Sequence, residues 1–269
     1  MIIDLNGELV AAADARLDPF DRGFTLGDAI FESLRVKGGT PEFAAGHLSR
    51  LAEAAKVTGM PLPFTEEQAL ARMARLTGAN DLPDAALRLT VSRGAAARGV
   101  AAPKAEDCKP TVVISLHPLP PTRSAVVGMI TATVTRRNEH SPFSCVKATP
   151  YLDSIIALEE AKAQGAQDAV LLNTAGRVAS ACYANLFAVI DGRLVTPPLA
   201  DGPLPGITRG RVLDALDGAE HSLLPADLAR ADEMFLTNSF GVRPVGVLDG
   251  RMLAPMPGPM TQKAQALVG

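Results

Sequence analysis

One lysine stands in a context that favours covalent chemistry. Lys147 lies in the segment FSCVKATPYLDS, after an apolar piece with strand-like composition and before a segment with the pattern of a helix. A lysine at such a junction can be partly buried, and burial favours the neutral amine that attacks an aldehyde. Composition alone favours a solvated loop lysine, because lysines are rarely buried. Lys147 is therefore a candidate nucleophile whose role depends on its surroundings.

Three further segments contain groups that bind anions. In PGITRGR (205–211), proline and glycine precede a predicted helix whose first amides, near Ile207 and Thr208, would be unpaired and suited to a phosphate. Arg50 lies on another predicted helix, and Arg98 lies in the loop SRGAAARG, whose arginines could grip a carboxylate. The alternatives are an ordinary N-cap, an exposed helical arginine and a flexible turn.

The composition excludes several other classes of protein. The net charge of −3 provides no basic field for nucleic acid or an anionic membrane, and no run of 18 apolar residues predicts a membrane span. The four histidines lack metal-ligand spacing, so no metal site is expected, and Walker, GxGxxG, HExxH and GxSxG motifs are missing. Three cysteines without a CxxC pair, and an N-terminus unlike a signal peptide, predict a cytoplasmic protein.

The chain is predicted to be an α+β protein in two parts. The segment HPLPPT contains three prolines in six residues and interrupts regular structure. Residues 117–121 are therefore predicted to link a small N-terminal α/β domain, 1–116, to a larger C-terminal domain, 122–269.

Local signals place several elements within these parts. Asn6–Gly7 predicts a hairpin between two short strands, and helices are expected at about 44–59, 65–77 and 152–164. Thr65 and Gln68 fit a capping box at the start of the second helix. We expect these elements to position the candidate residues.

The order of these segments resembles the class IV aminotransferase family, also called fold type IV enzymes of pyridoxal 5′-phosphate (PLP). The matching segments are DRGFTLGDAIFESLRV (21–36), HLSRL (47–51), RLTVSRGAAARG (88–99), VKATPYLD (146–153), GRVASACYANLF (176–187), PLPGITRGRVL (203–213) and ADEMFLTNSFGVRPV (231–245). They are colinear from near residue 20 to near residue 247. The resemblance implies two domains, the second a larger PLP-binding pseudo-barrel, and a homodimer with its active site near the subunit interface.

The resemblance also assigns roles. Lys147 would hold PLP covalently and then move protons at the substrate Cα. The cofactor phosphate would be bound by Arg50, Ile207, Thr208 and Ser239. Tyr151 would donate a hydrogen bond to the phenolic oxygen of the cofactor, and Arg98 would meet a substrate carboxylate.

One position departs from the family pattern. The family usually carries a glutamate four residues after the glycine of its GxVxE segment, where it pairs with the pyridine nitrogen of PLP. Here the glycine is Gly176 and that position is Ser180. A neutral hydroxyl supports a neutral pyridine, which is a weaker electron sink. We therefore expect Ser180 to favour elimination over transamination.

Within the family, the sequences of TNSFGVRPV and SRGAAARG most resemble the corresponding segments of 4-amino-4-deoxychorismate lyase. The expected reaction releases pyruvate and 4-aminobenzoate, a step of folate biosynthesis, from a small substrate with carboxylate and amine groups. The alternatives are an aminotransferase for branched-chain or D-amino acids with 2-oxoglutarate, and a non-catalytic binding protein that kept the fold.

Overall fold

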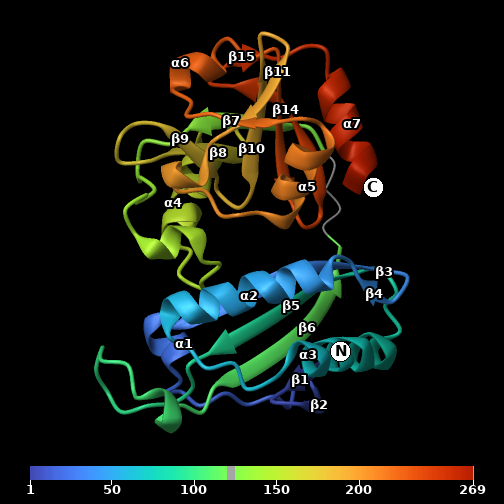
Figure 1. Cartoon of the computed structure of the whole chain (residues 1–269), viewed down its shortest axis with the longest axis vertical. Coiled ribbons are helices and arrows are strands. Elements are labelled where there is room, and N and C mark those ends of the chain that lie inside the picture. The colour runs from blue at the N-terminus through green and yellow to red at the C-terminus, as the bar shows by residue number, and fades with distance from the viewer. Residues whose placement is uncertain (120–124, 269) are drawn as a thin grey trace. The chain divides into compact units, whose positions relative to one another are not determined.

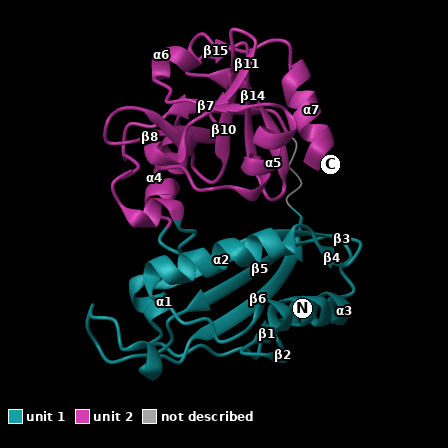
Figure 2. Cartoon of the chain, viewed as in Figure 1, with its two compact units in different colours: residues 1–120, 146–150 teal, residues 121–145, 151–269 magenta. Residues whose placement is uncertain are grey.

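The structure is a computed structural model that describes residues 1–119 and 125–268 (Figure 1). The chain forms two compact units, drawn in two colours in Figure 2. Unit 1 comprises Met1–Pro120 and Val146–Pro150, and unit 2 comprises Pro121–Cys145 and Tyr151–Gly269. The return of the chain to unit 1 at Val146–Pro150 carries Lys147 with it, and no sequence signal indicated this return.

Unit 1 is built on a six-stranded sheet with the strand order β2-β1-β6-β5-β3-β4. Its strands are β1 (Ile2–Leu5), β2 (Glu8–Ala11), β3 (Ala29–Lys37), β4 (Thr40–Pro41), β5 (Ala85–Ser92) and β6 (Thr111–Pro118). All neighbouring strands are antiparallel. The predicted Asn6–Gly7 hairpin is confirmed, with φ angles of 53° and 95° that suit this pair of residues.

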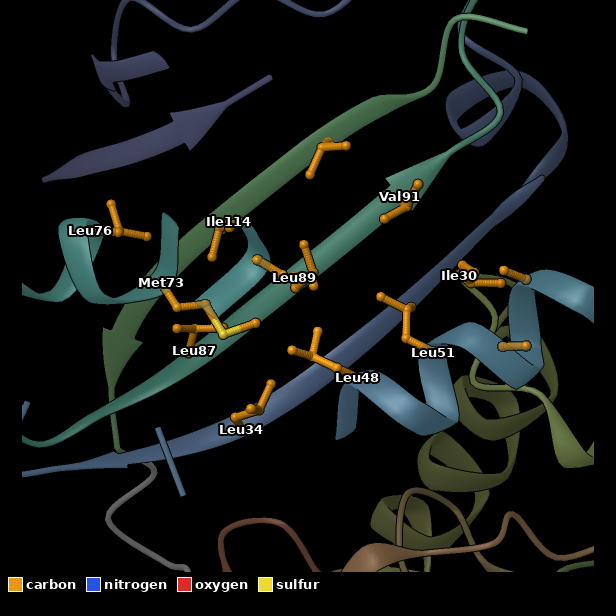
Figure 3. Close-up of a cluster of buried hydrophobic side chains, with 14 of the residues drawn as sticks. Ile30, Leu34, Leu48, Leu51, Met73, Leu76, Leu87, Leu89, Val91 and Ile114 are labelled. Atoms are coloured by element: carbon orange, nitrogen blue, oxygen red, sulfur yellow. The ribbon is translucent and has the colours of Figure 1, made fainter. Parts of the chain in front are cut away.

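Two helices of unit 1 pack on one face of this sheet. They are α2 (Ala44–Thr58) and α3 (Glu66–Asn80), and both predicted helices are confirmed. Thr65 and Gln68 form the predicted capping box. Figure 3 shows how the helices bury their apolar side chains against the strands, with Met73 beside Leu87 and with Leu48 and Leu51 along β3. A further short helix, α1 (Arg22–Leu26), begins at the N-cap Asp21, and a 3₁₀ turn covers Ala105–Asp107.

The predicted linker at 117–121 overlaps the last strand of unit 1. Strand β6 continues to Pro118, because Pro118 still lies opposite Ala85 on β5. A proline is tolerated at a strand end, where its missing amide is not needed for the ladder. The segment 120–124, which includes the rest of the predicted linker after residue 119, lies outside the described residues.

Unit 2 contains a nine-stranded mixed sheet that forms a half-barrel. The strand order is β12-β11-β10-β13-β14-β7-β8-β9, with β15 paired to β14. The strands are β7 (Val127–Thr131), β8 (Asp168–Leu172), β9 (Val178–Ala181), β10 (Asn185–Ile190), β11 (Arg193–Thr196), β12 (Ala219–Glu220), β13 (Glu233–Asn238), β14 (Gly241–Leu248) and β15 (Arg251–Met252). Mixed pairing and short strands give the α+β class that the sequence predicted.

The helices of unit 2 are α4 (Leu152–Ala163), α5 (Ile207–Ala215), α6 (Pro225–Leu228) and α7 (Pro259–Val268), with 3₁₀ turns at Pro142–Cys145 and Leu199–Asp201. Phe187 on β10 and Phe235 on β13 stack with ring centroids 5.1 Å apart. They share a buried cluster with Val212 of α5 and Ala264 of α7, which fixes both helices against the sheet. Within the described residues, no helix is long and apolar enough to cross a bilayer.

Candidate active site

Backbone hydrogen bonds hold the segment around Lys147 against the first residues of β3. The amide of Phe31 donates to the carbonyl oxygen of Lys147 at 2.9 Å, and the amide of Thr149 donates to the carbonyl oxygen of Ala29 at 3.0 Å. The side chain is half-buried, and its Nζ lies 4.2 Å from the centroid of the Phe31 ring. The predicted partial burial is therefore observed. The apolar strand expected before Lys147 is wrong, because Pro142–Cys145 forms a 3₁₀ turn there.

Arg88 lies beside the same aromatic ring, and sequence analysis gave it no role. Its guanidinium carbon is 3.6 Å from the centroid of the Phe31 ring. Arg88 on β5 lies opposite Ser33 on β3, on the face of the sheet that points away from Leu87 and Leu89. The alternating pattern of ALRLTVS contained a signal for Arg88. Leu87 and Leu89 face the core, so Arg88 between them points to the opposite face of the sheet. Arg88 and the Lys147 amine thus both lie against the Phe31 ring.

Arg50 is fixed by a buried carboxylate that the sequence did not single out. Its Nε donates to Oε1 of Glu32 at 2.8 Å, and its Nη2 donates to Oε2 at 2.7 Å. Nδ1 of His47 lies 2.7 Å from Oε2 of the same carboxylate. Burial alone would raise the pKa of Glu32, but the hydrogen bonds from Arg50 and His47 outweigh it and hold that pKa below its usual range. Glu32 therefore fixes the orientation of the guanidinium predicted to meet a phosphate.

Arg98 lies in an exposed loop of unit 1 after β5, in agreement with the loop predicted from SRGAAARG. Among the described residues, no hydrogen bond or ion pair of its side chain is seen. The backbone just beyond it is anchored, because Arg22 donates to the carbonyl oxygens of Gly99, Val100 and Ala101. The loop is thus held by its backbone while the Arg98 guanidinium extends into solvent.

The predicted phosphate-binding residues of unit 2 meet at the start of α5. Oγ1 of Thr208 donates to the carbonyl oxygen of Asn238 at 2.9 Å, which joins the helix to the end of β13 and the turn that carries half-buried Ser239. Gly206 precedes the helix, and no side chain caps it within the described residues. A Cβ at Gly206 would lie 2.1 Å from Oδ1 of Asn185, so any larger residue here would have to displace the Asn185 amide.

Tyr151 and Ser180 also lie in unit 2. Tyr151 is half-buried at the N-terminal boundary of α4. Ser180 is buried on β9, where it lies opposite Leu171 of β8. The structure thus gathers Lys147, Phe31 and Arg88 in one group of unit 1, Arg50 with Glu32 in a second, and Thr208 with the Asn238–Ser239 turn in unit 2. Their roles toward cofactor and substrate remain predictions.

The comparisons with known proteins point to one family. The sequence model of the family described as Amino-transferase class IV matches residues 29–247. A protein of Methanocaldococcus jannaschii named "Putative branched-chain-amino-acid aminotransferase" is 34% identical over 260 residues, which cover 94% of this chain and 90% of that protein.

Solved structures agree with this match. The 4-amino-4-deoxychorismate lyase of Pseudomonas aeruginosa is 31% identical, has a TM-score of 0.84, and covers 98% of this chain and 97% of its own. The branched-chain aminotransferase of Thermoproteus uzoniensis, solved with norvaline, is 29% identical with a TM-score of 0.92, covering 99% of this chain and 92% of its own. Another branched-chain amino acid aminotransferase, 25% identical with a TM-score of 0.89, was solved with pyridoxamine 5′-phosphate. These likenesses confirm the fold type IV architecture predicted from sequence.

The residues present fit a phosphorylated pyridine aldehyde. Lys147 supplies a half-buried amine, and the uncapped start of the nine-residue helix α5 supplies amides suited to a phosphate. Beside it, the buried hydroxyl of Thr237 on β13 has no hydrogen-bond partner among the described residues. PLP supplies an aldehyde that captures the substrate amine and a ring that accepts electrons. The match over most of the chain and these residues show that the protein belongs to the class IV aminotransferase family and is a PLP-dependent enzyme.

Proposed function

We propose that this enzyme is a lyase that converts 4-amino-4-deoxychorismate into 4-aminobenzoate and pyruvate. The observation that carries the proposal is Ser180, which occupies the usual place of the family glutamate and is buried on β9. Among the described residues, no carboxylate forms a hydrogen bond with its hydroxyl. A neutral partner leaves the pyridine nitrogen of PLP less protonated and weakens the electron sink. A reaction with its own driving force tolerates this loss better than transamination.

The proposed reaction has such a driving force because its ring becomes aromatic. The Lys147 amine removes the proton from the ring carbon that bears the substrate amine. The carbon–oxygen bond to the enolpyruvyl group breaks, and the released enolpyruvate takes up a proton to become pyruvate. Lys147 thus acts as a general base, for which its half-buried place beside Phe31 excludes part of the surrounding water.

An arginine near Lys147 supplies part of the proposed recognition of carboxylates. Arg88 lies against Phe31, whose ring also adjoins the Lys147 amine, so a carboxylate held by Arg88 would lie near the reacting lysine. A guanidinium binds a carboxylate through two parallel hydrogen bonds, which fixes orientation as well as charge. We propose that Arg88 and Arg98 divide the recognition of the substrate's carboxylates between them.

The runner-up is an aminotransferase for branched-chain or D-amino acids with 2-oxoglutarate as acceptor. The 34% identity with the archaeal relative favours it, since that protein is named for branched-chain substrates. The two activities share the lysine and the phosphate site and differ in the substrate pocket, which loops build.

A substrate assay separates the two proposals. Purified enzyme loaded with PLP is expected to release pyruvate from 4-amino-4-deoxychorismate faster than it transfers amino groups from leucine or D-alanine to 2-oxoglutarate. Lys147→Ala is expected to abolish both activities, because it removes the base and the cofactor anchor. Amino transfer without pyruvate release would reject the lyase proposal in favour of the aminotransferase.

Ser180→Glu tests the observation that carries the proposal. A carboxylate at this position is expected to protonate the pyridine nitrogen, to shift the absorbance of bound cofactor and to raise amino transfer about tenfold or more relative to pyruvate release. Ser180→Ala is the matched control, because it alters the same buried site without adding charge. An unchanged spectrum and an unchanged activity ratio in Ser180→Glu would remove the role of Ser180.

We also propose that the enzyme works as a homodimer in the cytoplasm. Large apolar side chains are exposed in both units: Phe20 and Phe24 around α1 in unit 1, and Leu152, Ile155 and Ile156 on α4 in unit 2. Exposed apolar groups of this size favour an interface between proteins. All three cysteines are free thiols, as expected in a reducing compartment. Light scattering on the purified enzyme tests the assembly, with Phe24→Glu expected to weaken it.

A further inference from the structure

Asp28 joins two buried arginines in unit 1 that the proposed reaction does not use. Nε of Arg22 donates to Oδ2 of Asp28 at 2.8 Å, and Nε of Arg93 donates to the same oxygen at 2.7 Å. Nη2 of Arg93 donates to the other oxygen at 3.1 Å. Burial alone would raise the pKa of Asp28, but the hydrogen bonds from Arg93 and Arg22 outweigh it and lower that pKa. The carboxylate is therefore ionised and fixes both guanidinium groups.

The two arginines connect Asp28 to different parts of the fold. Arg93 donates to the carbonyl oxygens of Thr58 at 2.8 Å and Gly59 at 3.0 Å, which end α2. The amide of Arg93 also donates to the carbonyl oxygen of Asp28 at 3.1 Å. These contacts tie Asp28 to the end of a core helix, so it provides a rigid base for Arg22.

The remaining donors of the Arg22 guanidinium bind three consecutive carbonyl groups. Nη1 donates to the oxygens of Gly99 at 3.0 Å and Ala101 at 3.2 Å, and Nη2 donates to that of Val100 at 3.1 Å. Only a planar guanidinium has enough donors to hold three carbonyls and a carboxylate together. This loop otherwise lies in solvent, with Val100 85% exposed, and the held residues directly follow Arg98.

The base of the same loop is fixed by its backbone. The amide of Arg22 donates to the carbonyl oxygen of Gly94 at 3.0 Å, and a Cβ at Gly94 would lie 1.9 Å from the carbonyl oxygen of Lys109. The loop is thus fixed at residue 94 by backbone contacts and at residues 99–101 by the Arg22 side chain. Arg98 lies between these two points of attachment.

We propose that Arg22, oriented by Asp28, is a positioning residue that holds Arg98 at the substrate carboxylate. This inference rests on the proposed role of Arg98 in substrate binding. It assigns to the DRGFTLGD segment a task in substrate recognition. Without the attachment to Arg22, the loop samples other positions, and the competent one is populated less often, which weakens substrate binding.

Arg22→Lys tests the proposal while keeping the charge. A lysine ammonium cannot span Asp28 and three carbonyls, so KM is expected to rise about tenfold with kcat changed less than about twofold. The absorbance of cofactor bound at Lys147 is expected to stay unchanged. Hydrogen exchange of the amides at 96–101 is expected to become faster, which reports on the loop without any substrate. Arg251→Lys is the matched control, because Arg251 also donates to two loop carbonyls, those of Leu228 and Ala231.

A double-mutant cycle with Arg98→Gln shows whether Arg22 acts through Arg98. Arg98→Gln alone is expected to raise KM at least tenfold, and Arg22→Lys is expected to add less than about twofold to it. Ala101→Gly, which loosens the loop and keeps Arg22, is expected to raise KM in the same direction, and it keeps the test available if Arg22→Lys does not fold.

The cycle separates this inference from the proposed function. If Arg98→Gln raises KM and Arg22→Lys does not, or if the two effects simply add, the positioning role of Arg22 is overturned while Arg98 keeps its role. If Arg98→Gln leaves KM unchanged, the substrate role of Arg98 fails and the inference fails with it. Unchanged exchange at 96–101 in Arg22→Lys would also overturn the attachment of the loop to Arg22.

Discussion

Two of the buried carboxylates that lie beside an arginine, Glu32 in unit 1 and Asp168 in unit 2, behave in opposite ways. In unit 1, Glu32 receives two hydrogen bonds from Arg50 and one from His47, and its pKa is lowered. In unit 2, Asp168 is fully buried on β8, and Nη1 of Arg243 lies 3.6 Å away, beyond normal hydrogen-bond distance. Burial raises the pKa of Asp168, and nearby backbone amides and Arg243 offset only part of that rise.

The difference lies in how the arginine uses its donors. Arg50 directs two of them at Glu32, whereas Nη1 of Arg243 donates to the Tyr183 hydroxyl at 2.8 Å. Oδ2 of Asp168 is left without a hydrogen bond among the described residues, although Oδ1 receives the amides of Ala169 and Cys182. A buried charge is favourable only when hydrogen bonds replace its lost water, so closeness of an arginine is not enough.

Glu32→Gln removes the charge of the carboxylate that has the more complete set of hydrogen bonds. It leaves Arg50 without its carboxylate, and the free energy of unfolding is expected to fall by about 3 kcal/mol at pH 7. Because the folded pKa of Glu32 is below its unfolded value of 4.5, its contribution is present above that value and is lost as pH falls through the folded pKa. The cost of the substitution should therefore shrink on acidification. Urea unfolding between pH 3 and pH 7 measures both effects.

Glu53→Gln is the matched control for that experiment. Glu53 lies on α2 like Arg50, but its side chain is exposed, and among the described residues it pairs with exposed Lys56. Loss of the Glu53 charge is expected to leave the free energy of unfolding unchanged within experimental error at every pH. A Glu32→Gln variant as stable as this control would show that the three hydrogen bonds only replace those that the unfolded chain makes with water.

Asp168→Asn tests the poorly paired side, with a smaller expected cost of about 1 kcal/mol at pH 7. The asparagine oxygen keeps both backbone hydrogen bonds of Oδ1, and only a long ion pair is lost. The folded pKa of Asp168 is raised above 3.8, so its stabilising contribution is complete below that value and is lost as pH rises through the folded pKa.

The cost of Asp168→Asn should accordingly grow on acidification, opposite in sign to that of Glu32→Gln. The same series of urea unfolding curves measures it. If both substitutions gave the same dependence on pH, the distinction between the two carboxylates would be wrong.

These two carboxylates also show the limit of prediction from sequence. Asn6–Gly7 and the Thr65–Gln68 cap were predicted because each motif is complete within four residues. Glu32, in contrast, has its partners on α2, 15 and 18 residues away, and nothing in FESLR shows that they will meet. Asp168 depends on Arg243, which arrives through the β13–β14 hairpin from the far end of the chain.

The candidate site shows the same division. Lys147, Thr208 and Arg50 were chosen from local sequence context and resemblance, and the structure places the latter two in contacts that orient them. Arg88 was missed because its significance depends on cross-strand neighbours and on the return of Val146–Pro150 to unit 1. A single sequence does not reveal such long-range pairing, since register is set by the whole sheet.

Tyr183→Phe gives the smallest expected effect and sharpens the comparison most directly. Removing the hydroxyl releases Nη1 of Arg243, which can then approach Oδ2 of Asp168. We expect the pKa of Asp168 to fall toward its ordinary value, while the free energy of unfolding changes by only about 0.5 kcal/mol because half-exposed Tyr183 loses a single hydrogen bond. NMR titration of the Asp168 carboxyl carbon measures the pKa. Tyr151→Phe, the other tyrosine of the chain, is the control. An unaltered Asp168 titration in Tyr183→Phe would mean that burial alone raises the pKa of Asp168, and that the hydrogen bond of Arg243 to Tyr183 does not contribute to this rise.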